Sequence, residues 1–300
     1  MMYEPQSFEH WRVPAGSIGQ AQFEAVIAHP RFAAAARQLS RSMLDLAASD
    51  AALDGIMKDV GRFSAAGLAI YLDATGGLTL ARMKELCALN TVVSPGRARA
   101  LLLYLRFLRY VEPVESSSRA ARFAPTPALT AAYRTIMRTG IAAATAIEPG
   151  LGRLSNRLGD AAVMTRFIRI SGELGLTLAR GPMDNALWRV FLNRHAGTQI
   201  LHALMLASDD EAHYPPQGAI AFSLTGLARR FHVSRPHVAR LLRTAEQEGL
   251  VVPAGEGRLA FTEAGRTAAA ELLGVRLSND LQAAIRLMDA LDADTAAPAG

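Results

Sequence analysis

An internal repeat is the sequence feature that most constrains how this chain can fold. Residues 50–57 (DAALDGIM) match residues 184–191 (DNALWRVF) at an offset of 134, and the offset is 136 where 122–126 (RFAPT) meet 258–262 (RLAFT). Between these matches the offset reaches 140, and each change of offset falls in a segment expected to be a loop. Ordered self-similarity of this kind indicates one structural unit that occurs twice. The chain is therefore expected to contain two copies of the same unit.

Breaks rich in Pro and Gly divide the chain into its expected domains. A length of 300 residues agrees with about two domains, and the segment EPGLG separates the two copies of the repeat. We expect, in order, an N-terminal arm at 1–19, a first unit at 20–147, a linker at 148–154, a second unit at 155–292 and a flexible tail at 293–300.

Helical periodicity dominates both copies. Alanine and leucine, the strongest helix formers, supply much of the apolar content. Apolar residues recur at spacings of three and four, the pattern of a helix with one buried face, in residues 32–46, 53–72, 161–178, 187–206 and 277–291. Strand patterns are few and pair around turn residues into two hairpins, 110–114 with 122–124 and 250–253 with 258–261. The expected fold class is mainly α, with a small β-hairpin in each copy.

The stretch 223–252 carries the most specific pattern. It predicts a first helix over 224–231, a short turn and a second helix that Ser234 caps at its N-terminus and Gly249 ends. Proline in the first turn fits the start of that second helix. Its inward stripe is expected to be Val238, Leu241, Leu242 and Ala245, which leaves outward Arg235, His237, Arg240 and Arg243. Donors at the start of such a helix suit base edges in the DNA major groove.

These residues resemble the winged helix-turn-helix domains of bacterial MarR-like transcription regulators. The likeness lies in GLARRFHVSRPHVARLL, in EQEGLVV and in the FTEAGR pattern at 261–266. It implies a mainly α fold with small β-wings, built as two repeated winged helix-turn-helix units in one chain with flanking helices. The resemblance also implies that Arg258 contacts DNA beside the wing and that the groove is read by Ser234, Arg235, His237, Arg240 and Arg243. The wing, AGEG, is short and carries Glu256, unlike the long basic wing of many members.

The first copy of this motif, at 85–111, keeps a serine in the capping position and an inward stripe of leucines. Its outward side is basic, but Leu103 stands where the second copy has Arg243. An apolar residue on that side suits packing against a partner element. Both DNA contact and a dimerisation or scaffold role stay open for this copy. Its candidate DNA-binding residues are Ser94, Arg97, Arg99, Arg119 and Arg122.

The net charge of the chain, +5, is too small to demonstrate a polyanionic partner by itself. Its distribution is more informative, because residues 91–145 hold eight Arg and two Glu, and residues 229–266 hold seven Arg and four Glu. Basic charge is thus concentrated on the two segments that carry the motif, as binding to a phosphate backbone requires. An ordinary solvated surface remains the alternative reading of the same charges.

The location of the protein follows from what the sequence lacks. The single cysteine, Cys87, excludes an intrachain disulfide framework and fits a reducing compartment. Because Cys87 takes a small inward position, it is expected to be a core thiol. No signal peptide is visible, and no apolar run approaches the roughly 20 residues needed to cross a bilayer. We therefore expect a soluble, cytoplasmic protein without a membrane partner.

Enzymatic and cofactor-binding functions find little support. His195, His202 and His213, with the acidic residues 209–211, match no closed zinc site. No phosphate-cradling glycine loop and no nucleophile elbow occurs, so we expect no cofactor and no catalytic residue. The residues that could line a pocket for a small-molecule effector have the spacing of ordinary core, and they are Trp188, Phe191, Met205 and Met164.

The sequence therefore predicts a transcription regulator that binds double-stranded DNA and is not an enzyme. If both copies read DNA, the site is an imperfect palindrome with half-sites about one helical turn, roughly 34–36 Å, apart. The helix at 277–291 leaves a homodimer open. The main alternative is a scaffold or chromosome-associated protein that binds other proteins, which Leu103 and Phe107 favour. A small-molecule enzyme that borrows a winged helix to dimerise is a weaker alternative, because no length remains for a catalytic domain.

Overall fold

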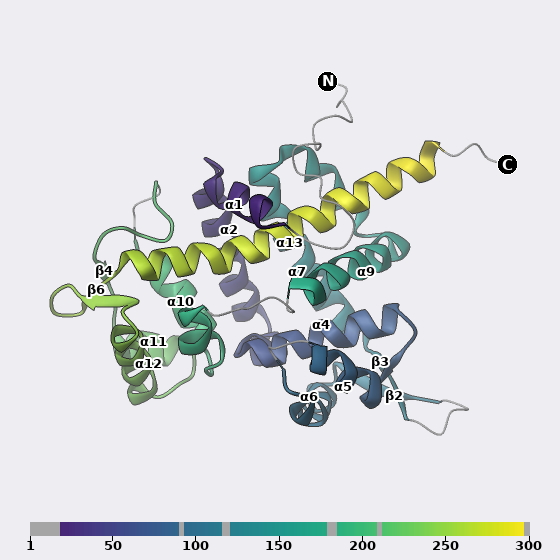
Figure 1. Cartoon of the computed structure of the whole chain (residues 1–300). Helices are drawn as coiled ribbons and strands as arrows, with labels where there is room; N and C mark the ends of the chain where they lie inside the picture. The colour runs from purple at the N-terminus through teal and green to yellow at the C-terminus, as the bar shows by residue number, and fades with distance from the viewer. Residues whose placement is uncertain (1–18, 90–92, 116–120, 179–184, 209–211, 297–300) are drawn as a thin grey trace. The chain divides into compact units, whose positions relative to one another are not determined.

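The computed structural model describes residues 19–89, 93–115, 121–178, 185–208 and 212–296. These residues are mainly helical and include two small antiparallel sheets of three strands each (Figure 1). Within these ranges no helix combines the length and the hydropathy that crossing a membrane requires. The expected mainly α class with small hairpins is confirmed.

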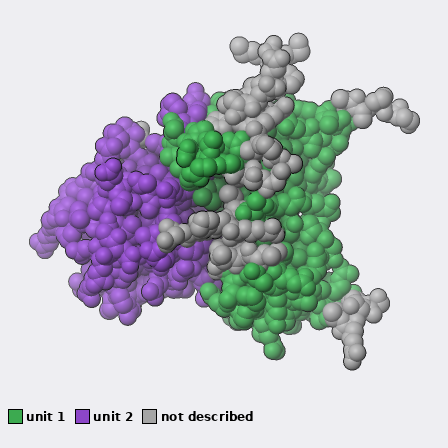
Figure 2. Space-filling model, viewed as in Figure 1, with its two compact units in different colours: residues 1–28, 64–181, 275–300 green, residues 29–63, 182–274 purple. Residues whose placement is uncertain are grey.

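The chain forms two compact units, and each contains segments from both halves of the sequence (Figure 2). Unit 1 comprises residues within 1–28, 64–181 and 275–300, and unit 2 comprises residues within 29–63 and 182–274. The sequence-based boundaries at 147 and 155 therefore do not coincide with this division. The difference arises because residues 29–63 group with the second copy of the repeat, whereas residues 155–181 and 275–292 group with the first.

Unit 1 is built on α4 (Val60–Ala74), of which the last eleven residues belong to this unit, and on α7 (Pro127–Ile147). Between them lie β1 (Leu78–Thr79), α5 (Leu80–Leu89), α6 (Pro95–Phe107), β2 (Val111–Val114) and β3 (Arg122–Pro125). The other elements are α1 (Gln20–Ala28), the 3-10 helix η2 (Pro149–Arg153), α8 (Leu154–Arg157), α9 (Ala161–Leu178) and the C-terminal part of α13 (Glu263–Ala296). Gly172 lets α9 pack closely on Tyr71 of α4, and Arg169 Nε donates to the Ala74 carbonyl at 2.7 Å.

Unit 2 joins two helices of the first half, α2 (Phe32–Ser49) and α3 (Ala51–Met57), to the second hairpin-bearing segment. That segment comprises the π-helix η3 (Trp188–Leu192), α10 (Gly197–Met205), β4 (Ile220–Ala221), α11 (Leu224–Arg230), α12 (Arg235–Gln247), β5 (Val251–Pro253), β6 (Arg258–Phe261) and the start of α13. Its largest fully buried side chains include Phe191, Phe261, Leu39 and Ile56. The core of unit 2 therefore draws on both halves of the chain.

The two units repeat the same order of elements. A helix, a two-residue strand, two helices, a hairpin and a long helix follow one another in each unit, and the sheets have the equivalent orders β1-β3-β2 and β4-β6-β5. The four strands expected from the sequence are present within a residue or two, as β2, β3, β5 and β6. The third strand of each sheet, β1 or β4, was not expected, because two residues carry no periodicity.

Several helix boundaries differ from the sequence-based expectation. The helix expected at 53–72 is two helices, because the carboxylate of Asp59 accepts from the Arg62 amide at 2.9 Å and starts α4 afresh. The helix expected at 187–206 is interrupted where Ala196 adopts a left-handed backbone with φ 56°. The terminal helix, expected at 277–291, extends over Glu263–Ala296. The linker segment at 148–154 forms η2, where Leu151 is fully buried.

Candidate nucleic-acid interface

The helices α11 and α12 pack against each other in unit 2, and their local sequence explains their geometry. The hydroxyl of Ser234 accepts from the His237 amide at 3.2 Å and caps α12, as the sequence predicts. His232, in the turn between the helices, has a left-handed backbone with φ 53°. The inward stripe of Val238, Leu241, Leu242 and Ala245 is buried, so this prediction is confirmed.

The opposite side of α12 is exposed and basic. Arg235, Arg240 and Arg243 are all exposed, and in the described part of the chain none of their guanidinium groups has a hydrogen-bond or ion-pair partner. Arg229 and Arg230, in the last turn of α11, are exposed as well. The pair of helices thus presents guanidinium groups that keep their donors for an external acceptor.

His237 lies differently from the expectation that it points outward with the arginines. Its Nε2 atom lies 2.9 Å from the carbonyl oxygen of His195, in the segment between η3 and α10. Because that carbonyl can only accept, Nε2 carries the proton in this contact. The ring therefore links α12 to the segment before α10. Burial, helped by the charges of Arg62 and Lys58, lowers the pKa of His195 itself.

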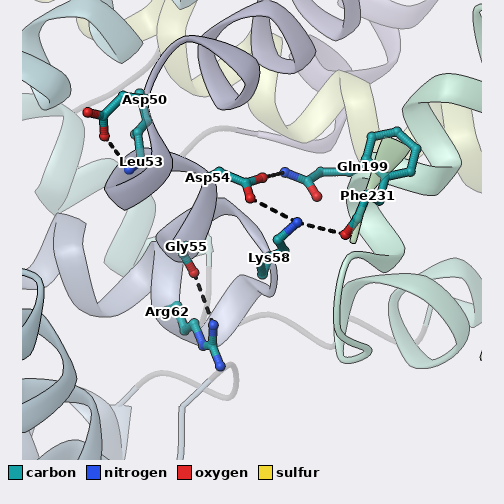
Figure 3. A network of polar contacts seen from close by, with 8 residues as sticks. All are labelled: Asp50, Leu53, Asp54, Gly55, Lys58, Arg62, Gln199 and Phe231. Carbon is teal, nitrogen blue, oxygen red and sulfur yellow. Dashed lines mark hydrogen bonds and ion pairs between the residues drawn. The ribbon is translucent and has the colours of Figure 1, made fainter. Parts of the chain in front are cut away.

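A buried lysine holds the end of α11 in place (Figure 3). Lys58, only 6% exposed, donates from Nζ to the carbonyl of Phe231 at 2.9 Å. The same Nζ pairs with Asp54 at 2.9 Å, and the other oxygen of Asp54 accepts from Gln199 at 2.8 Å. Because Phe231 is the C-cap of α11, this network fixes the turn that leads into α12.

No sequence motif includes Lys58, although two signals in the sequence point to it. Lysine occurs at only two positions in a chain rich in arginine, Lys58 and Lys84, and Asp54 precedes Lys58 by four residues. An acid four residues before a lysine lies on the same helix face. That Lys58 is buried against Phe231, 173 residues away, follows only from tertiary packing.

In the hairpin of unit 2, Arg258 is exposed and begins β6, directly after the turn. Its Nη2 atom donates to the carbonyl of Ala219 at 2.9 Å, just before β4. This bond links the residue before β4 to the hairpin, and it occupies one of the donors of the guanidinium group. Glu256 is exposed in the turn of the hairpin, so the tip presents a negative charge next to Arg258.

In unit 1, α6 differs from α12 at both its start and its outer side. Ser94 takes the N-cap position with an extended backbone but makes no side-chain cap hydrogen bond, unlike the capping role expected for it. Arg97 and Arg99 are exposed. The outer side also carries Leu103 and Phe107, which are among the exposed large apolar residues.

The other two candidates of the first copy are Arg119 and Arg122. The guanidinium of Arg122 packs over Gly77, and its charge opposes the rise that burial causes in the pKa of the Asp73 carboxyl. Arg119 lies outside the described residues. Among the described candidates of this copy, Arg97 and Arg99 lie on α6, which Ser94 precedes as the N-cap residue.

Several of the residues considered for other functions take core positions. Cys87 is buried as expected, and burial raises the pKa of its thiol. His202 is buried against Ser40, and residues 209–211 lie outside the described ranges. Phe191 and Met205 are buried in unit 2 and Met164 in unit 1. Trp188, the fourth residue considered for an effector pocket, is half-buried in unit 2. The four residues thus belong to two different units.

Comparisons with known proteins give no relative from which a function could be inferred. No protein-family model, no curated protein and no solved structure matches it. The candidate interface consists of the exposed guanidinium groups of α12 and the end of α11. Its framework is the cap of Ser234, the buried stripe of α12 and the network around Lys58.

Proposed function

We propose that the chain is a DNA-binding transcription regulator built from two winged helix-turn-helix units similar to the MarR-like ones, and that α12 is its recognition helix. The observation that carries this proposal is that Arg235, Arg240 and Arg243 are exposed on a helix whose other side is buried, and that their guanidinium groups have no partner among the described residues. A helix of this width fits the major groove. In this reading α11 supports α12, and the β5–β6 hairpin is the wing.

The residues of α12 divide into two roles. Residues near the start of a recognition helix contact base edges, so Arg235 and Arg240 read bases, and the rigid fork of an arginine suits guanine. Arg243, farther along the helix, holds a backbone phosphate together with Arg229 and Arg230 of α11. Ser234 and His237 act as positioning residues, because the first caps α12 and the second ties it to the His195 carbonyl.

Selection of duplexes from a random pool, followed by binding across a salt series, tests this proposal. The wild-type chain is expected to enrich a defined sequence and to lose affinity steeply as salt rises. The variant Arg235→Ala/Arg240→Ala should lose sequence preference, since each bidentate base contact is worth about 1–3 kcal/mol. Arg97→Ala/Arg99→Ala on α6 is the matched control. Absence of duplex binding even at low salt would refute the proposal.

The number of half-sites in the selected sequence separates two versions of the mechanism. If α6 also reads DNA, the selected site is an imperfect palindrome with half-sites about one helical turn apart. We take α12 as the reader, and then one compact site suffices for one chain. A protein-interaction role is the second candidate function, and the exposed side chains of Leu103 and Phe107 favour it for unit 1.

A further inference from the structure

The last two turns of α6 carry an exposed apolar pair. Leu103 is 49% exposed and Phe107 is 80% exposed, and their spacing of four residues places them on one face of the helix. The core of unit 1 does not need them, because α6 buries a different stripe of Ala98, Leu101, Leu102 and Leu105. Large apolar side chains left together in water mark a surface that another molecule covers.

Basic residues flank this pair. Arg99 is exposed four residues before Leu103 and Arg106 three residues after it, so both lie next to Leu103 on the helix surface. The guanidinium of Arg106 lies 5.7 Å from the centroid of the Phe123 ring in β3, a contact that leaves its positive charge in place. The sequence of α6 contains no acidic residue. A second α6 would therefore bring like charges together, whereas carboxylates would complement this surface.

The position of the pair argues against contact with bases, and its apolar side chains offer no donor to a phosphate. Base contacts come from the first residues of a recognition helix, and Phe107 lies about 18 Å along the axis from Pro95 at the usual rise per residue. The equivalent positions of α12, at the offset of 140, are Arg243 and Gln247, both polar and exposed. Compared with α12, α6 thus carries apolar instead of polar residues at the end of the helix that is far from the expected base contacts.

We propose that the α6 patch, defined as Arg99, Leu103, Arg106 and Phe107, docks an acidic amphipathic helix of a partner protein. Apolar side chains of that helix cover Leu103 and Phe107, and its carboxylates face Arg99 and Arg106. This is a mode in which anchors at helical spacing supply affinity and charge supplies selectivity. The inference is independent of DNA reading by α12, since the two surfaces use different helices.

A pair of designed peptides tests the inference on the full chain. One peptide is an amphipathic helix of about five turns, with Leu along its apolar stripe and Glu on both flanks, and the second has Lys in place of every Glu. Fluorescence anisotropy of the labelled peptides measures binding to the wild type, to Leu103→Ala/Phe107→Ala and to Val252→Ala. Val252 is the matched control, because it is a 45% exposed apolar residue of unit 2.

The expected result is saturable binding of the Glu peptide, at least about tenfold tighter than the Lys peptide and at least about tenfold weaker in the double variant. Val252→Ala should bind the Glu peptide as the wild type does, and the double variant should retain duplex binding. Three results would overturn the inference. They are equal or absent peptide binding by wild type and double variant, loss of duplex binding in the double variant, and a wild-type dimer that the double variant dissociates in sedimentation experiments.

Discussion

Lys58 shows at the scale of one residue how a buried charge can hold a helix end. Replacing it by methionine keeps the volume but removes the donor to Phe231 and the partner of Asp54. We expect Lys58→Met to lower the free energy of unfolding by about 3 kcal/mol, the lower end for a broken buried pair, because Asp54 keeps Gln199. Urea denaturation measures the change. Lys84→Met, at the exposed lysine, should stay within about 0.5 kcal/mol, and equal effects would contradict this account.

His202 makes the stability of unit 2 sensitive to acid. Burial lowers its pKa to about 4, whereas the unfolded chain has the ordinary value of about 6.5. The unfolded chain therefore binds a proton that the folded chain does not, and stability present above pH 6.5 is lost as the pH falls toward 4. The loss from this residue amounts to about 3 kcal/mol.

The pH dependence of urea denaturation measures this contribution. Between pH 7.5 and pH 4, His202→Gln should lose about 3 kcal/mol less than the wild type, because the titrating group is gone. His232→Asn serves as the control, since it removes an exposed histidine at a left-handed position that asparagine tolerates. Parallel pH profiles of wild type and His202→Gln would disprove the assignment.

At the scale of elements, the starts of α6 and α12 differ although their sequences are equivalent. Ser234 caps α12 through its hydroxyl, whereas Ser94 makes no side-chain cap bond. Ser234→Ala should therefore cost about 1 kcal/mol, and Ser94→Ala only a few tenths. Thermal denaturation of the two variants checks the difference. A larger cost at Ser94 than at Ser234 would show that the caps are assigned wrongly.

Elements were predictable where their signal is local. The hairpins follow from alternating residues around turn types, and the buried stripe of α12 follows from its spacing. The breaks at Asp59 and Ala196 were missed, because helical periodicity continues across both. Helical spacing also predicts an outward His237, because it cannot show that the ring meets the His195 carbonyl. That contact depends on tertiary packing.

At the scale of the whole molecule, unit 2 needs α2 and α3 from the first copy of the repeat. Ser40 of α2 bonds His202 at 2.8 Å, Asp54 of α3 bonds Gln199, and Lys58, the C-cap of α3, bonds the carbonyl of Phe231. A fragment of residues 155–300 lacks these helices, so we expect it to show no cooperative thermal transition and weak near-ultraviolet circular dichroism. Adding residues 1–154 as a second fragment should restore both signals. A fragment 155–300 that melts like the intact chain would contradict the requirement of unit 2 for α2 and α3.

The sequence by itself determined the repeat, the mainly helical class, the two hairpins and the side of α12 that is buried. Each depends on residues a few positions apart, whose spacing sets which side chains share a face. Only the tertiary structure decided which helices join which unit, that Lys58 holds the end of α11, and that Phe107 stays exposed. Amphipathic helices rich in Ala and Leu can pack against many similar surfaces, so the choice of partner depends on complementary contacts between segments more than a hundred residues apart.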